Sequence, residues 1–347
     1  MHTKIIGWDI GGAHVKAALL DENGQILQVL QQPCPLWKGI DHLHQAMSVI
    51  LQALPTGQYL HAVTMTGELV DCFASREQGV QAIIQAVHQQ LNGQDLTIYA
   101  GRRGFLSPAD ITANEYMNIA SANWLASADL AAKQQAFGLF VDVGSTTTDI
   151  LLLEDQQVQA QGYSDYQRLV SGELLYTGIV RTAVMAIAQR AIFNGQEMGL
   201  MAEYFATMAD VYRLTGDLQD AHDQADTADG AEKTPKASAI RLSRMTGYEF
   251  AESDWPLWLD FAQQLKQQQK QLITNACLQQ IQRSQQPESL VLLGAGVGRF
   301  LVKQIATEQG FQYQDFAEIF QSSAQGEIDA NDCAPAVAVA YLAGGFC

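Results

Sequence analysis

The sequence predicts an α/β protein built from two related halves, and three observations support this prediction. Two apolar, β-branched stretches each end in an acid followed by a glycine turn, at Trp8-Asp9-Ile10-Gly11 and at Val141-Asp142-Val143-Gly144. The stretches align without a gap, with Asp142 placed 133 residues after Asp9, and self-similarity over such a distance indicates a duplicated half. Strand-like and helix-like segments alternate through both halves, as they do in α/β proteins.

The same repeat predicts the domain boundaries. We expect a first domain over residues 1–135 and a second over residues 136–347. The second contains a helical and acidic-loop insertion at about residues 195–255, where the apolar pattern weakens. A chain of 347 residues is long enough for two domains with separate cores.

In the first half, local patterns predict an alternating series of strands and helices. Asn23-Gly24 is a strong hairpin turn signal, Pro55 ends the first helix, and Ser75 precedes the second. In order, the predicted elements are the strands Lys4–Ile10, Val15–Leu20 and Ile26–Leu30, a helix with apolar positions from Leu43 to Leu54, the strand His61–Glu68, a helix from Ser75 to Leu91, the strand Leu96–Ala100 and one Ala-rich helix over Ala113–Lys133 that bridges the halves.

The second half repeats the hairpin and then departs from the first. Its predicted elements are the hairpin Phe140–Glu154, a helix that starts at Ser171–Glu173 and runs to about Arg190, a helix over Met198–Arg213, a long helix over Trp255–Arg283, a strand from Ser289 to Leu293, and a C-terminal helix over Ala334–Ala343. Between the second and third of these helices lies an acidic loop, residues 217–232, in which Asp recurs at every third position. Such a composition favours a solvated, mobile loop. The alternative is an active-site lid in which Asp226 and Asp229 hold a metal or an amine.

Composition and charge narrow the class of protein. Hydrophobic residues make up 48% and charged residues 16%, as in an ordinary soluble globular protein. The net charge of −17 argues against nucleic acid and against anionic membrane surfaces, which both attract positive charge. We see no apolar signal stretch before the first strand and no apolar run of transmembrane length. The cysteines are odd in number and scattered, which predicts reduced thiols in a cytoplasmic protein: Cys34, Cys72, Cys277, Cys333 and Cys347.

The two Asp-x-Gly turns have the chemistry of a phosphate site. Gly144 permits a tight turn, and the hydroxyl and N–H groups of Ser145, Thr146 and Thr147 can face an anion. Asp142 can carry Mg²⁺, which usually combines one or two carboxylates with phosphate oxygens. A lone motif of this kind would equally suit a simple Ser/Thr-rich turn, but the second copy favours phosphate.

The copy near the N-terminus supplies the residues Asp9, Gly11, Gly12 and Lys16. Two such turns that face each other across a cleft would hold a polyphosphate from both sides.

Four further candidates follow from position. Glu68 ends a predicted strand and could act as a base, with a solvated acid near a helix start as the alternative. Arg102 suits phosphate or carboxylate recognition, although an exposed basic turn explains it as well. Glu173 either caps a helix or points into the cleft. The turn Gly294-Ala295-Gly296 lacks the spacing of a dinucleotide fingerprint, but it follows a strand where a nucleoside or another flat polar group would lie.

These motifs together resemble a known superfamily. The two turns and Gly294-Ala295-Gly296 resemble the two phosphate motifs and the adenosine motif of acetate and sugar kinases, heat-shock chaperones and actin. The resemblance covers the whole chain and implies two related actin/ribonuclease H-like domains, which arise by duplication of one βββαβαβα unit and flank a central cleft.

A narrower resemblance rests on four stretches, Gly7–Gly12, Met65–Leu69, Phe140–Thr148 and Ala209–Leu214. They look like hydantoinase A/oxoprolinase-related proteins linked to tetrahydromethanopterin C1 transfer, and among these like the aryl-ether-forming enzymes of methanofuran and methylofuran biosynthesis. That resemblance implies a transferase that joins an aminomethylfuranyl-methyl diphosphate to a tyrosine- or tyramine-type phenol and releases diphosphate.

The resemblance also implies roles for the candidate residues. Asp9 and Asp142 would hold Mg²⁺, Lys16 and the second-turn hydroxyls would contact the phosphates, and Glu68 or Glu173 would take the phenol proton. ATP can be accommodated by such a fold but is not required by this reaction, and a homodimer is compatible with it. Two other functions stay open: an ATP-dependent kinase or hydantoinase/oxoprolinase-type enzyme, and a non-catalytic nucleotide-binding switch.

Overall fold

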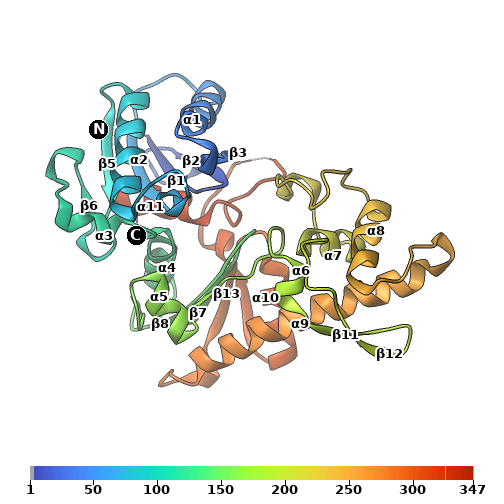
Figure 1. The fold of residues 1–347 in the computed structure, drawn as a ribbon. Coiled ribbons are helices and arrows are strands. Elements are labelled where there is room, and N and C mark those ends of the chain that lie inside the picture. The colour runs from blue at the N-terminus through green and yellow to red at the C-terminus, as the bar shows by residue number, and fades with distance from the viewer. Residues whose placement is uncertain (1–3, 325, 347) are drawn as a thin grey trace. The chain divides into compact units, whose positions relative to one another are not determined.

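The computed structural model describes residues 4–324 and 326–346, and the chain forms two compact units (Figure 1). The first unit contains Met1–Phe140, Leu151–Asp165 and Gln314–Cys347. The second contains Val141–Ile150 and Tyr166–Tyr313. Each unit is made of separate stretches of the chain, so the units do not correspond to continuous sequence halves. The domain boundaries expected from the repeat, 1–135 and 136–347, therefore stay a prediction.

The first sheet has the strand order β3-β2-β1-β4-β5-β6. Its strands are β1 Ile5–Ile10, β2 His14–Leu20, β3 Ile26–Pro33, β4 Leu60–Met65, β5 Asp95–Tyr99 and β6 Phe105–Leu106. The first three form an antiparallel meander, while β4 joins β1 and β5 joins β4 in parallel. Gly24 in the β2–β3 turn has φ +83°, as the Asn-Gly signal predicts. The helices α1 Asp41–Ala53 and α2 Arg76–Leu91 connect the parallel strands, and the Ser75 hydroxyl caps α2.

The C-terminal helix α11, Ala334–Gly344, packs on the centre of this sheet. All residues of β1 are buried, and a Cβ on Gly7 would lie only 1.9 Å from the Ala336 carbonyl oxygen. The helix and the strand therefore touch through their backbones. This contact explains why α11 consists largely of small residues.

The second sheet has the order β10-β8-β7-β13-β14, with β9 also paired to β8. Its strands are β7 Phe137–Val143, β8 Thr148–Glu154, β9 Gln157–Val158, β10 Leu174–Leu175, β13 Val291–Ala295 and β14 Gln312–Asp315. Thus β8, β7 and β13 occupy the places that β2, β1 and β4 occupy in the first sheet. The predicted fold class is confirmed: the protein is mixed α/β, with two sheets of the actin/ribonuclease H-like type.

Helices and one hairpin complete the second unit. They are α5 Asp165–Ser171, α6 Val184–Ile187, α7 Met208–Thr215, α8 Pro235–Thr246, α9 Trp255–Ile281, α10 Arg299–Gln309 and the hairpin of β11 Arg190–Phe193 with β12 Gln196–Gly199. The long helix predicted over Trp255–Arg283 is confirmed.

The single helix predicted over Ala113–Lys133 is wrong. The region holds a short 3₁₀ turn at Ala113–Glu115, α3 Tyr116–Ile119 and α4 Asn123–Gln134. Ser121, between α3 and α4, has φ +49°, and a residue in the left-handed region cannot continue a right-handed helix.

The helix predicted from Ser171–Glu173 to Arg190 is also wrong. Ser171 ends α5 instead of starting a helix, and Gly172 follows it with φ +76°. The chain then pairs with β8 through β10, so its backbone groups bond to distant residues. The helix expected over Met198–Arg213 begins only at Met208, where Thr207 and Asp210 form a capping box.

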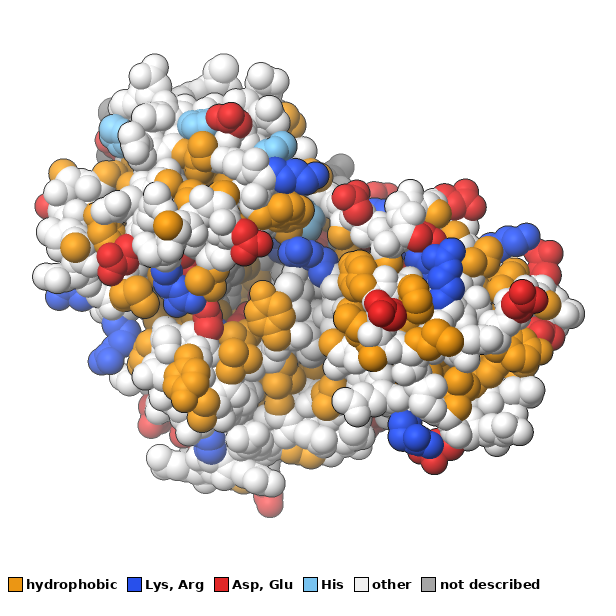
Figure 2. Space-filling view, in the orientation of Figure 1, with side chains coloured by type: hydrophobic (Ala, Val, Ile, Leu, Met, Phe, Trp, Pro, Cys, Tyr) orange, Lys and Arg blue, Asp and Glu red, His pale blue; other side chains and the backbone are white. Residues whose placement is uncertain are grey.

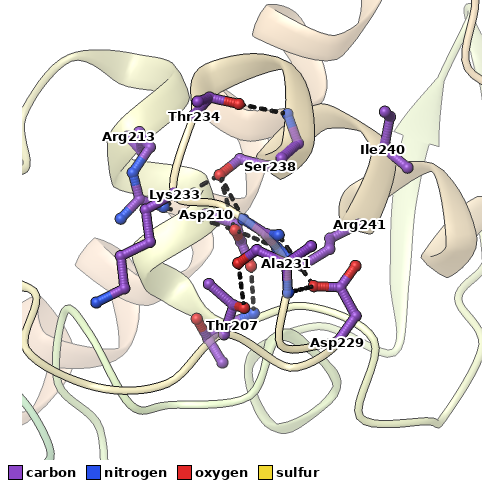
Figure 3. Close-up of polar contacts among 12 residues, drawn as sticks. Thr207, Asp210, Arg213, Asp229, Ala231, Lys233, Thr234, Ser238, Ile240 and Arg241 are labelled. Atoms are coloured by element: carbon purple, nitrogen blue, oxygen red, sulfur yellow. Dashed lines mark hydrogen bonds and ion pairs between the residues drawn. The ribbon is translucent and has the colours of Figure 1, made fainter.

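The acidic loop is not uniformly solvated. Asp223 is buried and pairs with Arg213, while Asp229 pairs with Arg241 at 3.1 Å and Arg244 at 2.8 Å. Figure 3 shows Arg241 lying between Asp229 and Asp210, a carboxylate that it contacts at 2.8 Å. Buried arginines on α7 and α8 therefore hold the loop against these helices, which the composition did not predict. Asp226 is exposed.

Surface charge, helix hydropathy and cysteine pairing each bear on the expectations from composition. Acidic and basic side chains are interspersed on the face drawn in Figure 2. Within residues 4–324 and 326–346, no helix combines the length and the hydropathy needed to cross a membrane. The cysteines in the described part form no disulfide, and Cys347 lies outside it.

Candidate functional site

Both predicted phosphate turns close in the same way. In the first turn, residues 11–14, the Gly11 N–H donates to the His14 carbonyl at 2.9 Å. In the second turn, residues 144–147, the Gly144 N–H donates to the Thr147 carbonyl at 2.9 Å. Equivalent residues of the repeat therefore make equivalent bonds, so the alignment of the two copies holds at the level of single hydrogen bonds.

The first turn brings Asp9 and Lys16 together. Asp9 on β1 lies opposite Lys16 on β2 and Thr64 on β4, so the three side chains share one face of the sheet. Asp9 is 6% exposed, and the Lys16 ammonium donates to the Asp332 carbonyl at 2.6 Å. The Thr64 hydroxyl is buried and has no hydrogen-bond partner among the described residues. A cation, a carboxylate and a hydroxyl thus gather beside this turn.

Gly11 and Gly12 are needed for close packing. A Cβ on Gly11 would lie 2.9 Å from the His14 carbonyl oxygen, and one on Gly12 would lie 2.8 Å from a Val70 methyl group. The Gly12 carbonyl also accepts from the Leu36 N–H at 3.1 Å. Close packing therefore explains why both positions hold glycine, whether or not they contact phosphate.

The second turn directs its backbone donors to one side. The Gly144 carbonyl accepts from the Ile179 N–H, and the Ser145 carbonyl accepts from the N–H groups of Val180 and Arg181 at 3.1 and 2.9 Å. Across a trans peptide bond the carbonyl and the next N–H point in opposite directions. The N–H groups of Ser145 and Thr146 therefore point away from this segment.

Successive N–H groups on one side of a turn form an anion-binding concavity. Ser145, Thr146 and Thr147 are half-buried. The direction of the two N–H groups is compatible with an anion, and phosphate binding by the second turn stays a prediction.

Asp142 lies against the glycine turn that follows β13. Gly296 has φ +77°, and a Cβ on it would lie 2.3 Å from Asp142 Oδ1 and 2.4 Å from the Val143 carbonyl oxygen. The Gly298 N–H donates to that same carbonyl at 2.8 Å. The structure thus brings the predicted residues Asp142 and Gly296 together, and the glycine leaves room for the carboxylate.

The other two residues of the glycine turn are buried. A Cβ on Gly294 would lie 2.7 Å from the Tyr313 ring, and Ala295 is fully buried. Packing on Tyr313 explains Gly294, and a nucleoside-binding role for this turn stays a prediction.

The two candidate bases differ in their surroundings. Glu173 is fully buried, and its two carboxylate oxygens are occupied by Arg283 at 3.3 Å and the Ser171 hydroxyl at 2.9 Å. Glu68 is 1% exposed, and its Oε1 accepts from the Ser121 hydroxyl at 2.7 Å. Its Oε2 is buried and has no hydrogen-bond partner among the described residues. Glu68 is therefore the better placed of the two to accept a proton.

The pKa of Glu68 also favours it as the candidate base. Burial raises the pKa of Glu68 above its ordinary value, while the hydrogen bond from Ser121 and the charge of Arg76, 3.9 Å away, oppose this rise. Arg76 is itself held by Asp165 at 2.7 Å. A carboxylate with a raised pKa is a stronger base at neutral pH than an ordinary glutamate.

Two further predicted residues have partners of their own. The Arg102 guanidinium stacks on the Tyr163 ring, 5.2 Å from its centroid. Burial alone would raise the pKa of Asp229, but hydrogen bonds from the Ala231 N–H and Arg244, with the charge of Arg241, hold it below its ordinary value. Asp229 is therefore a paired carboxylate.

Sequence reasoning missed several residues next to the candidates. Ser121, Arg76 and Asp165 surround Glu68, and the segment 177–182 supports the second turn. Gly172 and Gly178, inside the predicted helix, are the sequence signals against that helix.

The carboxylates alone do not build a metal cage. Within the described residues, no cluster of three or more His, Cys, Asp or Glu side chains could hold a metal ion. Magnesium, which takes one or two carboxylates and completes its shell with phosphate oxygens and water, fits such a donor set. Asp142 in the second turn and Asp9 in the equivalent place of the first are each a candidate carboxylate, and a metal role for either stays a prediction.

The chain is similar to one protein family and to two named synthases. The sequence matches the hydantoinase/oxoprolinase family over residues 60–326. It is 32% identical over 246 residues to the (4-{4-[2-(gamma-L-glutamylamino)ethyl]phenoxymethyl}furan-2-yl)methanamine synthase of Methanocaldococcus jannaschii, covering 71% of this chain and 72% of that protein. The synthase of the same name from Methanococcus vannielii is 33% identical over 107 residues, which are 31% of this chain and 48% of that protein.

Among solved structures, nucleotide-free acetone carboxylase is similar with a TM-score of 0.58 at 10% identity, over 98% of this chain and 70% of that one. At such low identity the likeness concerns the fold alone.

Proposed function

The chain belongs to the hydantoinase/oxoprolinase family, and from that membership we propose that it is a synthase that forms the aryl ether of a methanofuran- or methylofuran-type cofactor. The family resemblance predicted from the motifs is confirmed. The observation that carries the proposal is the 32% identity, over most of both chains, to a synthase whose product name contains a phenoxymethyl group on a furan. The relatives support a biosynthetic synthase role, and the substrates and leaving group given below are our proposal.

We propose an aminomethylfuranyl-methyl diphosphate as the donor and the phenol of a tyrosine or tyramine derivative as the acceptor. The phenol oxygen forms a bond to the furanylmethyl carbon while the bond from that carbon to the diphosphate oxygen breaks. The bonding pair leaves with diphosphate, and the phenol proton passes to a base. The furan ring stabilises the positive charge that develops on the methylene carbon. The rate therefore depends on how readily the diphosphate departs with the bonding pair.

The second turn suits the leaving diphosphate. The N–H groups of Ser145 and Thr146 point to one side of the turn, where they can donate to phosphate oxygens that gain charge as the bond breaks. Lys16, whose ammonium is held by the Asp332 carbonyl, is the cation beside the first turn. Magnesium, when bound, would neutralise diphosphate charge, with Asp142 and Asp9 as its carboxylates.

Glu68 is the proposed base. Its Oε2, which has no hydrogen-bond partner in the described part of the chain, can accept the phenol proton, and Ser121 fixes the carboxylate through Oε1. The raised pKa keeps the proton on Glu68 while the ether forms.

A direct assay tests the proposal. The purified chain is incubated with Mg²⁺, a synthetic aminomethylfuranyl-methyl diphosphate and either glutamyl-tyramine or tyrosine, and both diphosphate release and ether mass are followed. We expect equal amounts of ether and diphosphate with one of the acceptors, and loss of both products in Asp142→Asn. Thermal stabilisation by ATP together with no response to diphosphate would instead support an ATP-dependent enzyme of the same family.

A further inference from the structure

The second turn is supported by a segment that sequence reasoning had assigned to a helix. We call this segment, residues 177–182, the strap. The Thr177 carbonyl accepts from the Thr148 hydroxyl at 2.8 Å, and the Ile179 N–H donates to the Gly144 carbonyl at 3.1 Å. With the Val180 and Arg181 N–H groups on the Ser145 carbonyl, the strap holds both sides of the turn.

The strap touches the turn through its backbone. A Cβ on Gly178 would lie 2.5 Å from both the Ser145 carbonyl carbon and the Thr146 nitrogen. No side chain separates the two segments, so any shift of the strap shifts the peptide between Ser145 and Thr146. The direction of the Thr146 N–H therefore depends on the position of the strap.

A single buried side chain holds the strap from the other side. Gln269 on α9 is fully buried, and its amide nitrogen donates to the Thr177 hydroxyl at 2.7 Å and to the Gly178 carbonyl at 2.9 Å. Its amide oxygen accepts from the Tyr212 hydroxyl at 2.5 Å. Both amide protons and the amide oxygen are thus in use, which leaves one orientation for the side chain.

The Gly178 carbonyl fixes that orientation, because a carbonyl oxygen can only accept and therefore needs the Gln269 nitrogen. The amide oxygen then faces Tyr212, which lies fully buried on α7 and donates to it. Burial, with the charge of Asp217 added, raises the pKa of Tyr212, so its hydroxyl keeps the proton that it donates. The start of α7 also bonds the strap directly, because the Met208 N–H donates to the Thr182 carbonyl at 2.8 Å.

We propose that Gln269, held by Tyr212, is a positioning residue that sets the anion-binding N–H groups of the second turn. This inference rests on the proposed function only in assuming that the turn binds diphosphate. Asp210 and Arg213 flank Tyr212 on α7 and belong to the ion cluster of Figure 3. The insertion thereby contributes to the position of the turn through α7.

The test compares two buried glutamines of the same helix. Gln269→Leu removes both donors to the strap, whereas Gln280→Leu removes an amide that is equally buried but donates to the Ser171 carbonyl at 2.8 Å. Binding of inorganic diphosphate with Mg²⁺ is measured by calorimetry on the full chain. We expect Gln269→Leu to bind about tenfold more weakly and Gln280→Leu to bind like the wild type.

A second readout needs no ligand. The backbone amide resonances of Ser145 and Thr146 are followed by NMR, and we expect them to shift in Gln269→Leu and to stay in place in Gln280→Leu. If Gln269→Leu does not fold, Tyr212→Phe replaces it, with a smaller expected loss of about threefold, because it removes only the bond to the amide oxygen and leaves both donors to the strap in place.

The two readouts separate the two hypotheses. Amide resonances that stay unchanged overturn the positioning role, whatever diphosphate does. Shifted resonances in a chain whose wild type ignores diphosphate would support the positioning role and contradict the proposed function.

Discussion

The contact between Gly296 and Asp142 permits a quantitative test with a matched control. Gly296→Ala adds a methyl group that would lie 2.3 Å from Asp142 Oδ1 and 2.4 Å from the Val143 carbonyl oxygen, at a φ of +77°. Gly310 has nearly the same φ, +78°, but among the described residues no atom lies within 4 Å of a Cβ built there. Gly310→Ala therefore isolates the cost of the left-handed backbone from the cost of the collision.

The two substitutions should differ in size. An alanine in the left-handed region costs about 1–2 kcal/mol, and this is the whole expected loss for Gly310→Ala. Overpacking against rigid neighbours adds about 1–3 kcal/mol, so Gly296→Ala should lose about 2–5 kcal/mol. The Val143 carbonyl belongs to β7 and cannot move far, so the Asp142 carboxylate is the group that yields.

Displacement of Asp142 should reduce activity as well as stability. A shift of about 1 Å at a reacting group can cost about a hundredfold in rate, and we expect a loss of that order in diphosphate release by Gly296→Ala. Urea denaturation and the diphosphate assay are run on both variants at a temperature where both are folded. Equal destabilisation of the two variants would refute the close approach, and a destabilised Gly296→Ala with a normal rate would show that the carboxylate is not needed in this place.

The remaining predictions concern charge. Because Glu68 must lose its proton to act as a base, activity should fall as pH drops through its raised pKa. Arg76→Met removes a positive charge that lowers this pKa, so it should move the acidic limb of the pH–rate profile to higher pH. A profile that does not move would exclude Glu68 as the titrating base. His61 is fully buried, and burial lowers its pKa from 6.5 to about 4, so stability that is present above pH 6.5 is lost as pH falls towards 4. That pKa shift corresponds to a loss of roughly 3 kcal/mol in unfolding free energy between pH 7 and pH 4. The unfolding free energies of wild type and His61→Gln are compared at both pH values, and a difference between the two proteins that does not change with pH would contradict the prediction. Arg241→Met leaves the buried Asp210 without its 2.8 Å partner and should cost about 3–5 kcal/mol in urea denaturation, while the exposed Arg190→Met should cost less than about 1 kcal/mol; similar losses in both would argue against a buried ion cluster.

Features that depend on neighbouring residues could be predicted from the sequence. The Asp-x-Gly turns, the hairpins beside them and the long helix α9 follow from local residue types and periodicity, and the structure contains all of them. The repeat also predicted two related halves, and the structure adds that the two sheets share a strand order.

Features that depend on distant partners could not be predicted in this way. Ser121 breaks a helix that its neighbours favour, and it donates to Glu68, which lies far back in the sequence. The acidic loop has the composition of a solvated segment, but Arg241 and Arg213 hold its carboxylates. Composition records the charge of a segment and not the charge that packs against it.

The sequence by itself therefore determined the two turns, since a four-residue turn is closed by its own backbone, and their phosphate chemistry stays a prediction. Only the tertiary structure decided that Glu68 is the glutamate with an oxygen that has no hydrogen-bond partner among the described residues. It also decided that Gln269 donates to the strap. The physical reason is that hydrogen bonds between residues far apart in the chain replace local ones. The backbone of residues 177–182 bonds to the second turn instead of forming a helix, and no local pattern encodes that exchange.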